Sequence, residues 1–169
     1  MKWPCISDLS AAYRVRALSE RDLAAVLALC ESNPLYYRHC GFAPTAQTVR
    51  ADMTELPPGK TPDDKHFVGF FEGDRLAAVL DFVGGYPDPA TAYVGFFMVD
   101  GRLSGRGIGT GLIEEICGSL KGRGFSAVRL AYHPQNPQAS HFWRKNGFLP
   151  LREAMHERCG RLTVAQRAL

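Results

Sequence analysis

A glycine-rich segment at residues 104–111, Ser-Gly-Arg-Gly-Ile-Gly-Thr-Gly, has the clearest chemical capability in the chain. Apolar residues at helical spacing follow it, so its last glycines fall at the start of a helix. The first N–H groups of a helix lack intrahelical partners and the helix dipole favours negative charge there, while glycine lets the backbone approach an anion. Arg106 adds positive charge. The segment therefore predicts a loop that binds phosphate oxygens, although a tight structural turn would use the same glycines.

Two common phosphate sites do not fit this loop. A P-loop requires Gly-Lys followed by Ser or Thr, whereas this sequence has Gly-Thr-Gly at 109–111. A dinucleotide fingerprint beginning at Gly105 requires a small residue at position 110 and an acidic residue about 20 positions further on. The chain has Thr110 at the first of these positions and Arg129 near the second. A nucleotide site of either type is therefore not favoured.

A second motif, Asn-Pro-Gln-Ala-Ser-His-Phe-Trp-Arg-Lys-Asn-Gly-Phe, occupies residues 136–148. Together with the glycine loop, in this order, it resembles the GCN5-related N-acetyltransferase (GNAT) family. The first family motif, Gln/Arg-x-x-Gly-x-Gly/Ala after a strand ending in valine, is matched after Val99 with Ser104 in its first place. The second, Asn-x-x-Ala-x-x-Phe/Leu-Tyr-x-Lys-x-Gly-Phe, is matched except that Trp143 replaces the tyrosine. The resemblance covers about residues 13–167.

The resemblance implies an α/β (α+β) fold of one domain, with a mixed, mostly antiparallel central sheet of about 6–7 strands. The fourth strand (92–99) and the fifth (125–133) would splay apart and hold acetyl-CoA between them. The implied activity is acetyl-CoA-dependent transfer of an acetyl group to an amine by direct attack in a ternary complex. A small-molecule acceptor is expected, and a peptide N-terminus or lysine stays open. The alternative is a non-catalytic acyl-CoA-binding or regulatory domain.

The resemblance also assigns residues to acetyl-CoA. The backbone of the fourth strand would bind the pantetheine arm as an added strand would, and the glycine loop would hold the pyrophosphate. The second motif would contact the arm near the splayed strands. The implied acetyl-CoA residues are Phe97, Met98, Val99, Ser104, Gly105, Arg106, Gly107, Ile108, Gly109, Thr110, Asn136 and Trp143. Asn136 would serve equally well as the N-cap of the helix that follows.

The usual catalytic acid of the family is the tyrosine that Trp143 replaces here, and an indole N–H does not titrate near neutral pH. Two candidates for catalysis remain, Tyr132 at the end of the fifth strand and Tyr93, at the place of a glutamate base in some relatives. A thiolate with a pKa of about 8.5 also leaves without an acid. His133, His141 and Asp81 are further candidates for water-mediated bases, and a structural role is the commoner one for such residues.

The acceptor would bind at residues 33–42 and 84–89, which are rich in tyrosine. Tyr36, Tyr37 and Tyr86 are the expected substrate-binding residues, since they would form an aromatic pocket for a small amine. A hydrophobic cluster beneath a long loop would use the same side chains. Neither stretch contains an acidic cluster that would indicate a polyamine.

These residues require a defined order of elements. Alternating apolar residues predict strands at 13–18, 66–71, 75–83, 92–99, 125–133, 148–156 and 161–168. Helical spacing predicts helices after a capping box at 19–22, over 45–56, from 108 to 122 and over 137–146. Residues 35–42 are expected to be irregular. Residues 1–12 would form an N-terminal extension to a domain spanning 13–169.

Length and composition agree with one packed domain. The chain has 169 residues, 46% of them hydrophobic and 22% charged, and a formal net charge of +3, too small for a dedicated nucleic-acid binder. No apolar run approaches the ~18 residues of a membrane span, and no signal peptide is evident, so no membrane association and a cytoplasmic location are expected. Five scattered cysteines without a CxxC pair predict free thiols and no metal site. Whether the chain forms a homodimer stays open.

Overall fold

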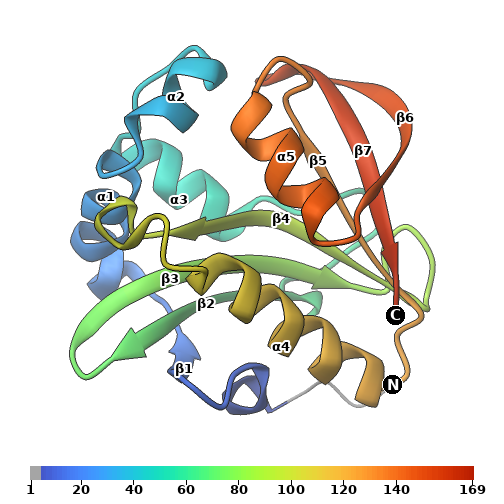
Figure 1. Cartoon of the computed structure of the whole chain (residues 1–169), viewed down its shortest axis with the longest axis horizontal. Coiled ribbons are helices and arrows are strands. Elements are labelled where there is room, and N and C mark those ends of the chain that lie inside the picture. Colours follow the sequence, from blue (N-terminus) through green and yellow to red (C-terminus); the bar gives the residue numbers. More distant parts are fainter. Residues whose placement is uncertain (1–4) are drawn as a thin grey trace.

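The computed structural model describes residues 5–169 as a seven-stranded sheet with helices on both faces (Figure 1). The strands are β1 Arg14–Ala17, β2 Lys65–Glu72, β3 Arg75–Gly84, β4 Thr91–Val99, β5 Ala127–Tyr132, β6 Leu149–His156 and β7 Gly160–Ala168. Their order in the sheet is β1-β2-β3-β4-β5-β7-β6, and every neighbouring pair is antiparallel except β4 and β5. The expected mixed, mostly antiparallel α/β fold is confirmed.

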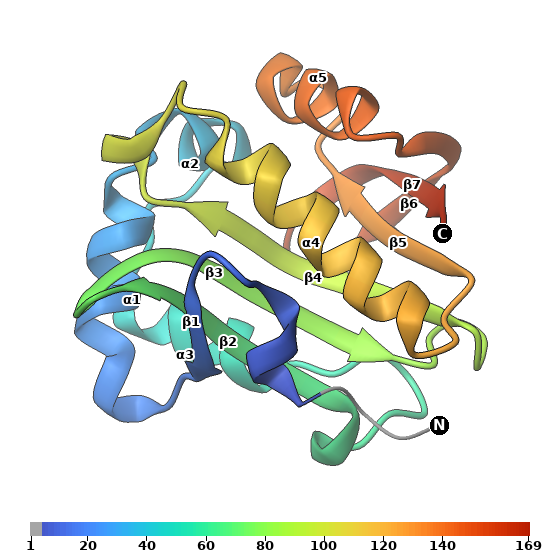
Figure 2. The ribbon, with the colours of Figure 1, turned by 60° about the horizontal axis from the view of Figure 1, so that its bottom comes forward.

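Within residues 5–169, five α-helices cover the sheet: α1 Leu23–Glu31, α2 Pro34–Cys40, α3 Ala46–Thr54, α4 Ile108–Gly122 and α5 Pro137–Lys145. Buried residues of α4 and α5 share one core with one face of the sheet, and buried residues of α1, α2 and α3 share a second core with the other face. Figure 2 shows α4 lying across its face of the sheet, with α1 and α3 behind. No helix within residues 5–169 is both long enough and apolar enough to cross a membrane.

Four short 3-10 helices link these elements: η1 Ile6–Leu9, η2 Glu20–Asp22, η3 Pro62–Asp64 and η4 Gly101–Leu103. The predicted capping box is present, with Ser19 and Asp22 bonding reciprocally ahead of α1. Part of the predicted N-terminal extension, residues 1–4, lies outside the described residues. Leu9 of η1 is fully buried in the core with α4, and the Ser10 hydroxyl donates to the Glu115 carboxylate at 2.5 Å. The predicted domain boundary at residues 12 and 13 stays a prediction.

Residues 35–42 differ from the sequence-based expectation, because the irregular stretch predicted there contains helix α2. Pro34 occupies the first turn, where its fixed φ suits a helix and its missing N–H costs nothing. Gly41, at φ +78°, ends the helix in the left-handed conformation. A proline that ends one helix therefore begins the next.

Strands β4 and β5 separate after a short paired region. They pair in parallel only from Thr91 with Ala127 to Val94 with Leu130. β4 then continues to Val99 without β5 beside it, and Figure 2 shows the two strands diverging. The predicted splay is therefore present in the structure.

A β-bulge lies at the point of separation. Phe82 of β3 pairs with Val94 and Asp81 pairs with Phe96, so Gly95 is the extra residue. The bulge reverses the alternation of β4: Ala92 and Val94 belong to the core beneath α4, whereas Phe96 and Met98 belong to the core beneath α1. The even-numbered side chains of β4 before Gly95 and those after it therefore lie on opposite faces of the sheet.

Candidate functional site

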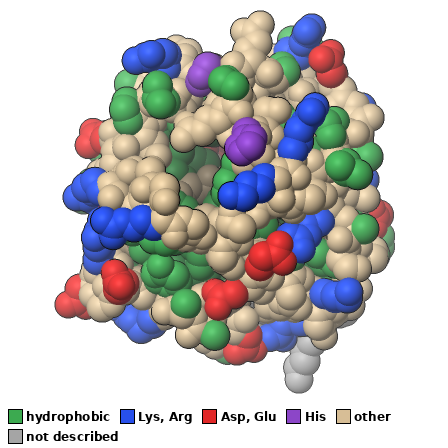
Figure 3. Space-filling model, in the orientation of Figure 1, with side chains coloured by type: hydrophobic (Ala, Val, Ile, Leu, Met, Phe, Trp, Pro, Cys, Tyr) green, Lys and Arg blue, Asp and Glu red, His purple; other side chains and the backbone are tan. Residues whose placement is uncertain are grey.

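A cavity of about 440 Å³ lies where β4 and β5 separate. Its lining comes from the bulged part of β4, the end of β5, α5, α3 and the β6–β7 turn. Figure 3 shows the surface hollowed between the part over α2 and α3 and the part over α5. The lining includes Tyr36, Asp52, Glu55, Asp81, Tyr86, Tyr93, Phe96, Phe97, Tyr132, Asn136, Trp143, His156 and Arg158.

Backbone groups of β4 face this gap. The Asp100 N–H donates to the Ala77 carbonyl of β3 at 2.8 Å. Because residues in an antiparallel pair alternate between bonded and non-bonded positions, the backbone of Phe97 and Val99 points away from β3, and that of Met98 points toward it. The Val99 carbonyl accepts a bond from the Asn33 side chain at 3.0 Å. The N–H groups of Phe97 and Val99 thus face the side from which β5 has withdrawn.

The start of α4 lies just beyond this stretch of backbone. Gly107, at φ +73°, is its N-cap, and no side chain caps the helix. Residues 104–107 are exposed, so the first N–H groups of this 15-residue helix open to solvent. Gly109 lies against α5, since a Cβ there would come within 3.0 Å of the Phe142 ring. The glycine loop therefore provides an open, uncapped helix N-terminus at the end of β4.

Two arginines at this loop have different roles. Arg102 binds the buried Asp100 carboxylate at 2.7 and 2.9 Å, and Arg75 approaches it at 3.3 Å. Burial acts to raise the pKa of Asp100, but hydrogen bonds from Arg102 and Arg75 outweigh it and lower the pKa to about 2. Arg106 is exposed and has no partner among residues 5–169. Arg102 thus anchors the loop, and Arg106 is the guanidinium left for an anion.

The second motif forms α5 and the wall of the gap. The Asn136 side chain accepts from the Ala139 N–H at 3.1 Å, so this buried asparagine is the N-cap of α5. Trp143 is buried among aromatic rings whose centroids lie 4.9 Å (Phe142), 5.1 Å (Phe148) and 6.0 Å (Phe97) away. Both residues line the cavity, and in addition each has a structural role.

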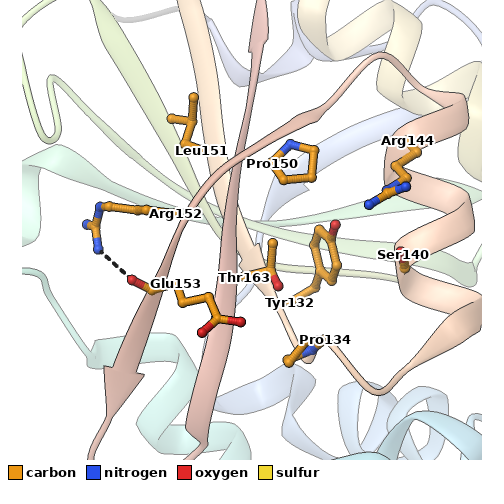
Figure 4. Close-up of a pocket in the computed structure, with 9 residues that line it drawn as sticks. All are labelled: Tyr132, Pro134, Ser140, Arg144, Pro150, Leu151, Arg152, Glu153 and Thr163. Atoms are coloured by element: carbon orange, nitrogen blue, oxygen red, sulfur yellow. Dashed lines mark hydrogen bonds between the residues drawn. The ribbon is translucent and has the colours of Figure 1, made fainter.

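The two candidate catalytic tyrosines lie at the same cavity with different environments. Tyr132 is buried under α5, and its hydroxyl points into a second cavity of about 360 Å³, toward Pro150 and Arg144 (Figure 4). Tyr93 lies edge-to-face with Tyr86 at 5.5 Å, and burial raises its pKa. Tyr132 thus lines both cavities, and its hydroxyl points into the second one.

The expected substrate-binding tyrosines divide into two groups. Tyr36 and Tyr86 line the cavity, and Tyr36 contacts Phe96 edge-to-face at 6.3 Å. Tyr37 is buried in the core beneath α1 and does not line the cavity. Burial raises its pKa, so its hydroxyl stays protonated at neutral pH. Its position favours packing beneath Tyr36.

Carboxylates that the sequence did not indicate as a group meet at this cavity. Arg158 of the β6–β7 turn bonds Asp52 at 3.0 Å and Glu55 at 3.3 Å, both near the end of α3. The Asp81 carboxylate of β3 accepts from the Lys65 ammonium at 2.8 Å. The two tyrosine-rich stretches lack acidic residues that line the cavity, but the fold supplies three from elsewhere. The one sequence signal for this group is the three-residue spacing of Asp52 and Glu55, which places the two side chains near each other at the end of a helix.

Comparisons with known proteins agree with this architecture. A model of the acetyltransferase (GNAT) family matches residues 28–148. No curated protein matches the sequence at a significant level. The fold is similar to an acetyltransferase from Thermus thermophilus, with 23% identity, coverage of 92% of this chain and 96% of that one, and a TM-score of 0.72.

Two further solved structures share the fold. Ard1 from Thermoplasma volcanium has 16% identity, coverage of 92% of this chain and 96% of that one, and a TM-score of 0.67. The PaiA N-acetyltransferase from Thermoplasma acidophilum, solved in complex with coenzyme A, has 19% identity, coverage of 92% and 98%, and a TM-score of 0.63. The family match spans most of the chain and includes the splayed strands, the uncapped helix and the second motif. The chain belongs to the GNAT family of acetyltransferases.

Proposed function

We propose that the protein is an acetyl-CoA-dependent N-acetyltransferase that forms a ternary complex with a small-molecule amine. The observation that carries the proposal is the continuity between unpaired β4 backbone and the uncapped start of α4. An extended, amide-containing arm would bond to Phe97 and Val99 as an added strand would. A pyrophosphate at its end would then meet the N–H groups that follow Gly107, with Arg106 beside it.

The chemistry follows from this placement. The thioester would lie near Gly95, where backbone N–H groups at the bulge stabilise the oxyanion that forms when the amine attacks. Trp143 would pack against the arm. The thiolate product needs no strong acid, since its pKa is about 8.5. This supports acetyl transfer even though Trp143 replaces the usual tyrosine and the Tyr132 hydroxyl points into the second cavity.

The acceptor would approach from the side of the cavity lined by Tyr36, Tyr86 and Tyr93. The alternative, a domain that binds acyl-CoA without catalysis, is favoured by the tryptophan at position 143. Thiol release from acetyl-CoA with a panel of amines, amino acids and short peptides separates the two, because a binding domain releases no thiol above the rate of hydrolysis.

Thermal unfolding tests the acetyl-CoA site directly. A ligand that binds only the folded protein raises Tm by an amount set by RT ln(1 + [L]/Kd). Arg106→Glu reverses the charge of an exposed arginine without a partner, so it should weaken acetyl-CoA binding by roughly tenfold or more, about 1.4 kcal/mol. Arg21→Glu is the matched control, since Arg21 is also exposed and has no partner among residues 5–169. Equal acetyl-CoA shifts in the two variants would contradict the loop assignment.

A further inference from the structure

Asp81 is a buried carboxylate with one oxygen left unused. Its side chain is 9% exposed, and its Oδ2 accepts a bond from Lys65 Nζ at 2.8 Å. Oδ1 has no hydrogen-bond partner within residues 5–169. Burying a carboxylate oxygen without a donor costs free energy, so such groups are rare unless a ligand or water completes them. Oδ1 itself is shielded from solvent, and the small exposed part of the Asp81 side chain lines the 440 Å³ cavity, where a ligand can approach the carboxylate.

The bulge in β4 brings Asp81 next to the separating strands. A Cβ at position 95 would lie 2.5 Å from Asp81 Oδ2, too close for any real contact. The glycine at this position therefore lets the carboxylate rest against the β4 backbone where β5 has withdrawn. This is also where the proposed function puts the thioester.

The charges around the cavity favour a cation. Three carboxylates, those of Asp52, Glu55 and Asp81, are matched by only two basic groups, Arg158 and Lys65. Arg158 is already bonded to both carboxylates of α3, and Lys65 uses only one oxygen of Asp81. These five groups together have a net charge of about −1 when all of them are ionised. A single ammonium group would balance it.

Aromatic side chains line this cavity as well. Tyr36, Tyr86, Tyr93 and Phe96 line the same cavity. They offer ring faces and edges to an apolar body and, at their faces, to a cation. A carboxylate on the acceptor would meet the excess negative charge instead. The lining therefore distinguishes a simple amine from an amino acid.

We propose that the Asp81 carboxylate binds the ammonium group of the acetyl acceptor and takes its proton, and that the acceptor is a primary amine with an apolar or aromatic body and no neighbouring carboxylate. This assignment rests on the proposed acetyltransferase function and specifies its second substrate. Asp81 acts on the amine directly, whereas Lys65 is a positioning residue that bonds to Oδ2.

Two protons leave the acceptor nitrogen during the transfer. Asp81 removes one proton from the ammonium, and the freed nitrogen lone pair forms the C–N bond to the thioester carbonyl carbon. The C–S bond breaks and its electron pair leaves with the sulfur of CoA. The thiolate gains the second proton lost by the nitrogen, and Asp81 returns the first to solvent. The products are the N-acetyl amine and CoA thiol.

The rate should depend on the ionisation of Asp81. Burial raises the pKa of Asp81 to about 6, Lys65 of β2 opposes the increase, and Asp52 and Glu55 of α3 add to it. Tyr93 of β4 and, at the β6–β7 turn, His156 and Arg158 also line the cavity. Because the carboxylate must be ionised to accept a proton, kcat/KM for the amine should fall as pH decreases through about 6.

Two matched pairs of compounds test the acceptor class: 2-phenylethylamine against phenylalanine, and 3-methylbutylamine against leucine. Each pair differs only by a carboxylate. With thiol release from acetyl-CoA as the assay, we expect kcat/KM at least tenfold higher for the amine in one pair. Equal rates, faster amino acids, or no thiol release with either amine would overturn the inference. The proposed function is judged separately by the acetyl-CoA thermal shift and by the wider panel.

Asp81→Asn tests the residue, and Asp22→Asn is its control, since Asp22 forms an ion pair with Arg16 away from the cavity. Asp81→Asn should lower kcat/KM for the amine by roughly 100-fold or more and abolish the decrease near pH 6. It should also abolish the thermal shift that 2-phenylethylamine produces in CoA-saturated protein, while the acetyl-CoA shift remains. The double variant Lys65→Met/Asp81→Asn, which leaves no unpaired buried ammonium, should behave in the same way as Asp81→Asn. Normal kcat/KM in either Asp81 variant would refute the inference without affecting the acetyl-CoA site.

Discussion

Replacing Asp81 with asparagine should change how the free energy of unfolding depends on pH. In the folded protein burial raises the pKa of this carboxyl to about 6, from an ordinary value of 3.8. Between these values the folded state binds more protons than the unfolded state, so stability falls as pH rises. At about 1.4 kcal/mol for each pKa unit, the full effect is about 3 kcal/mol. The wild-type protein therefore loses this stability on going from below pH 4 to above pH 6.

The measurable part lies between pH 5 and pH 7. By the same linkage, acidification from pH 7 to pH 5 should raise the free energy of unfolding of the wild-type protein by about 1 kcal/mol relative to that of Asp81→Asn. All other titratable groups are common to the two proteins. Urea unfolding at several pH values gives this difference, with Asp22→Asn as a control. The pKa of Asp22 is lowered by Arg16, so Asp22 is ionised in folded and unfolded protein above pH 5 and adds no slope. Parallel pH profiles for wild type and Asp81→Asn would refute the argument that burial perturbs Asp81.

Four other substitutions have defined outcomes. Asp100→Asn should lower the free energy of unfolding at neutral pH. Because the pKa of Asp100 is lowered to about 2, this loss of stability relative to wild type should shrink as pH falls from 4 toward 2, which urea unfolding measures. Gly118→Ala should raise stability by about 0.5–1 kcal/mol in chemical denaturation, since this exposed position within α4 has open space for a Cβ. Trp143→Phe removes three side-chain heavy atoms from an aromatic cluster, so we expect the free energy of unfolding to fall by about 2 kcal/mol. Acetyl-CoA binding should weaken, and kcat should change less than about tenfold. A 100-fold lower kcat at unchanged affinity would indicate that the indole N–H takes part in the reaction. Tyr132→Phe should retain kcat within about tenfold on any amine that is turned over, because its hydroxyl points into the second cavity; a loss of 10² or more would restore it as the acid.

Much of the fold was predictable because its signals are local. Alternation and helical spacing predicted all seven strands and four of the five α-helices, and turn residues marked their ends. Helix α2 was not predicted, because a proline such as Pro34 is common both just after a helix and in the first turn of one. The bulge at Gly95 was also missed, because it depends on how β3 pairs with β4.

The sequence determines more of the proposed acetyl-donor site than of the proposed acceptor site. The glycine loop and the motif at 136–148 are continuous segments, and their chemistry resides in backbone N–H groups and one helix start, so their types and spacing alone indicated the family. The acceptor side has no such segment. Asp52, Asp81 and Arg158 are far apart in the chain and come together only because β3 runs beside β4 and the β6–β7 turn reaches α3. Only the folded chain buries Asp81 and gives it a single bond from Lys65, and this is why one Asp81 oxygen has no donor within residues 5–169.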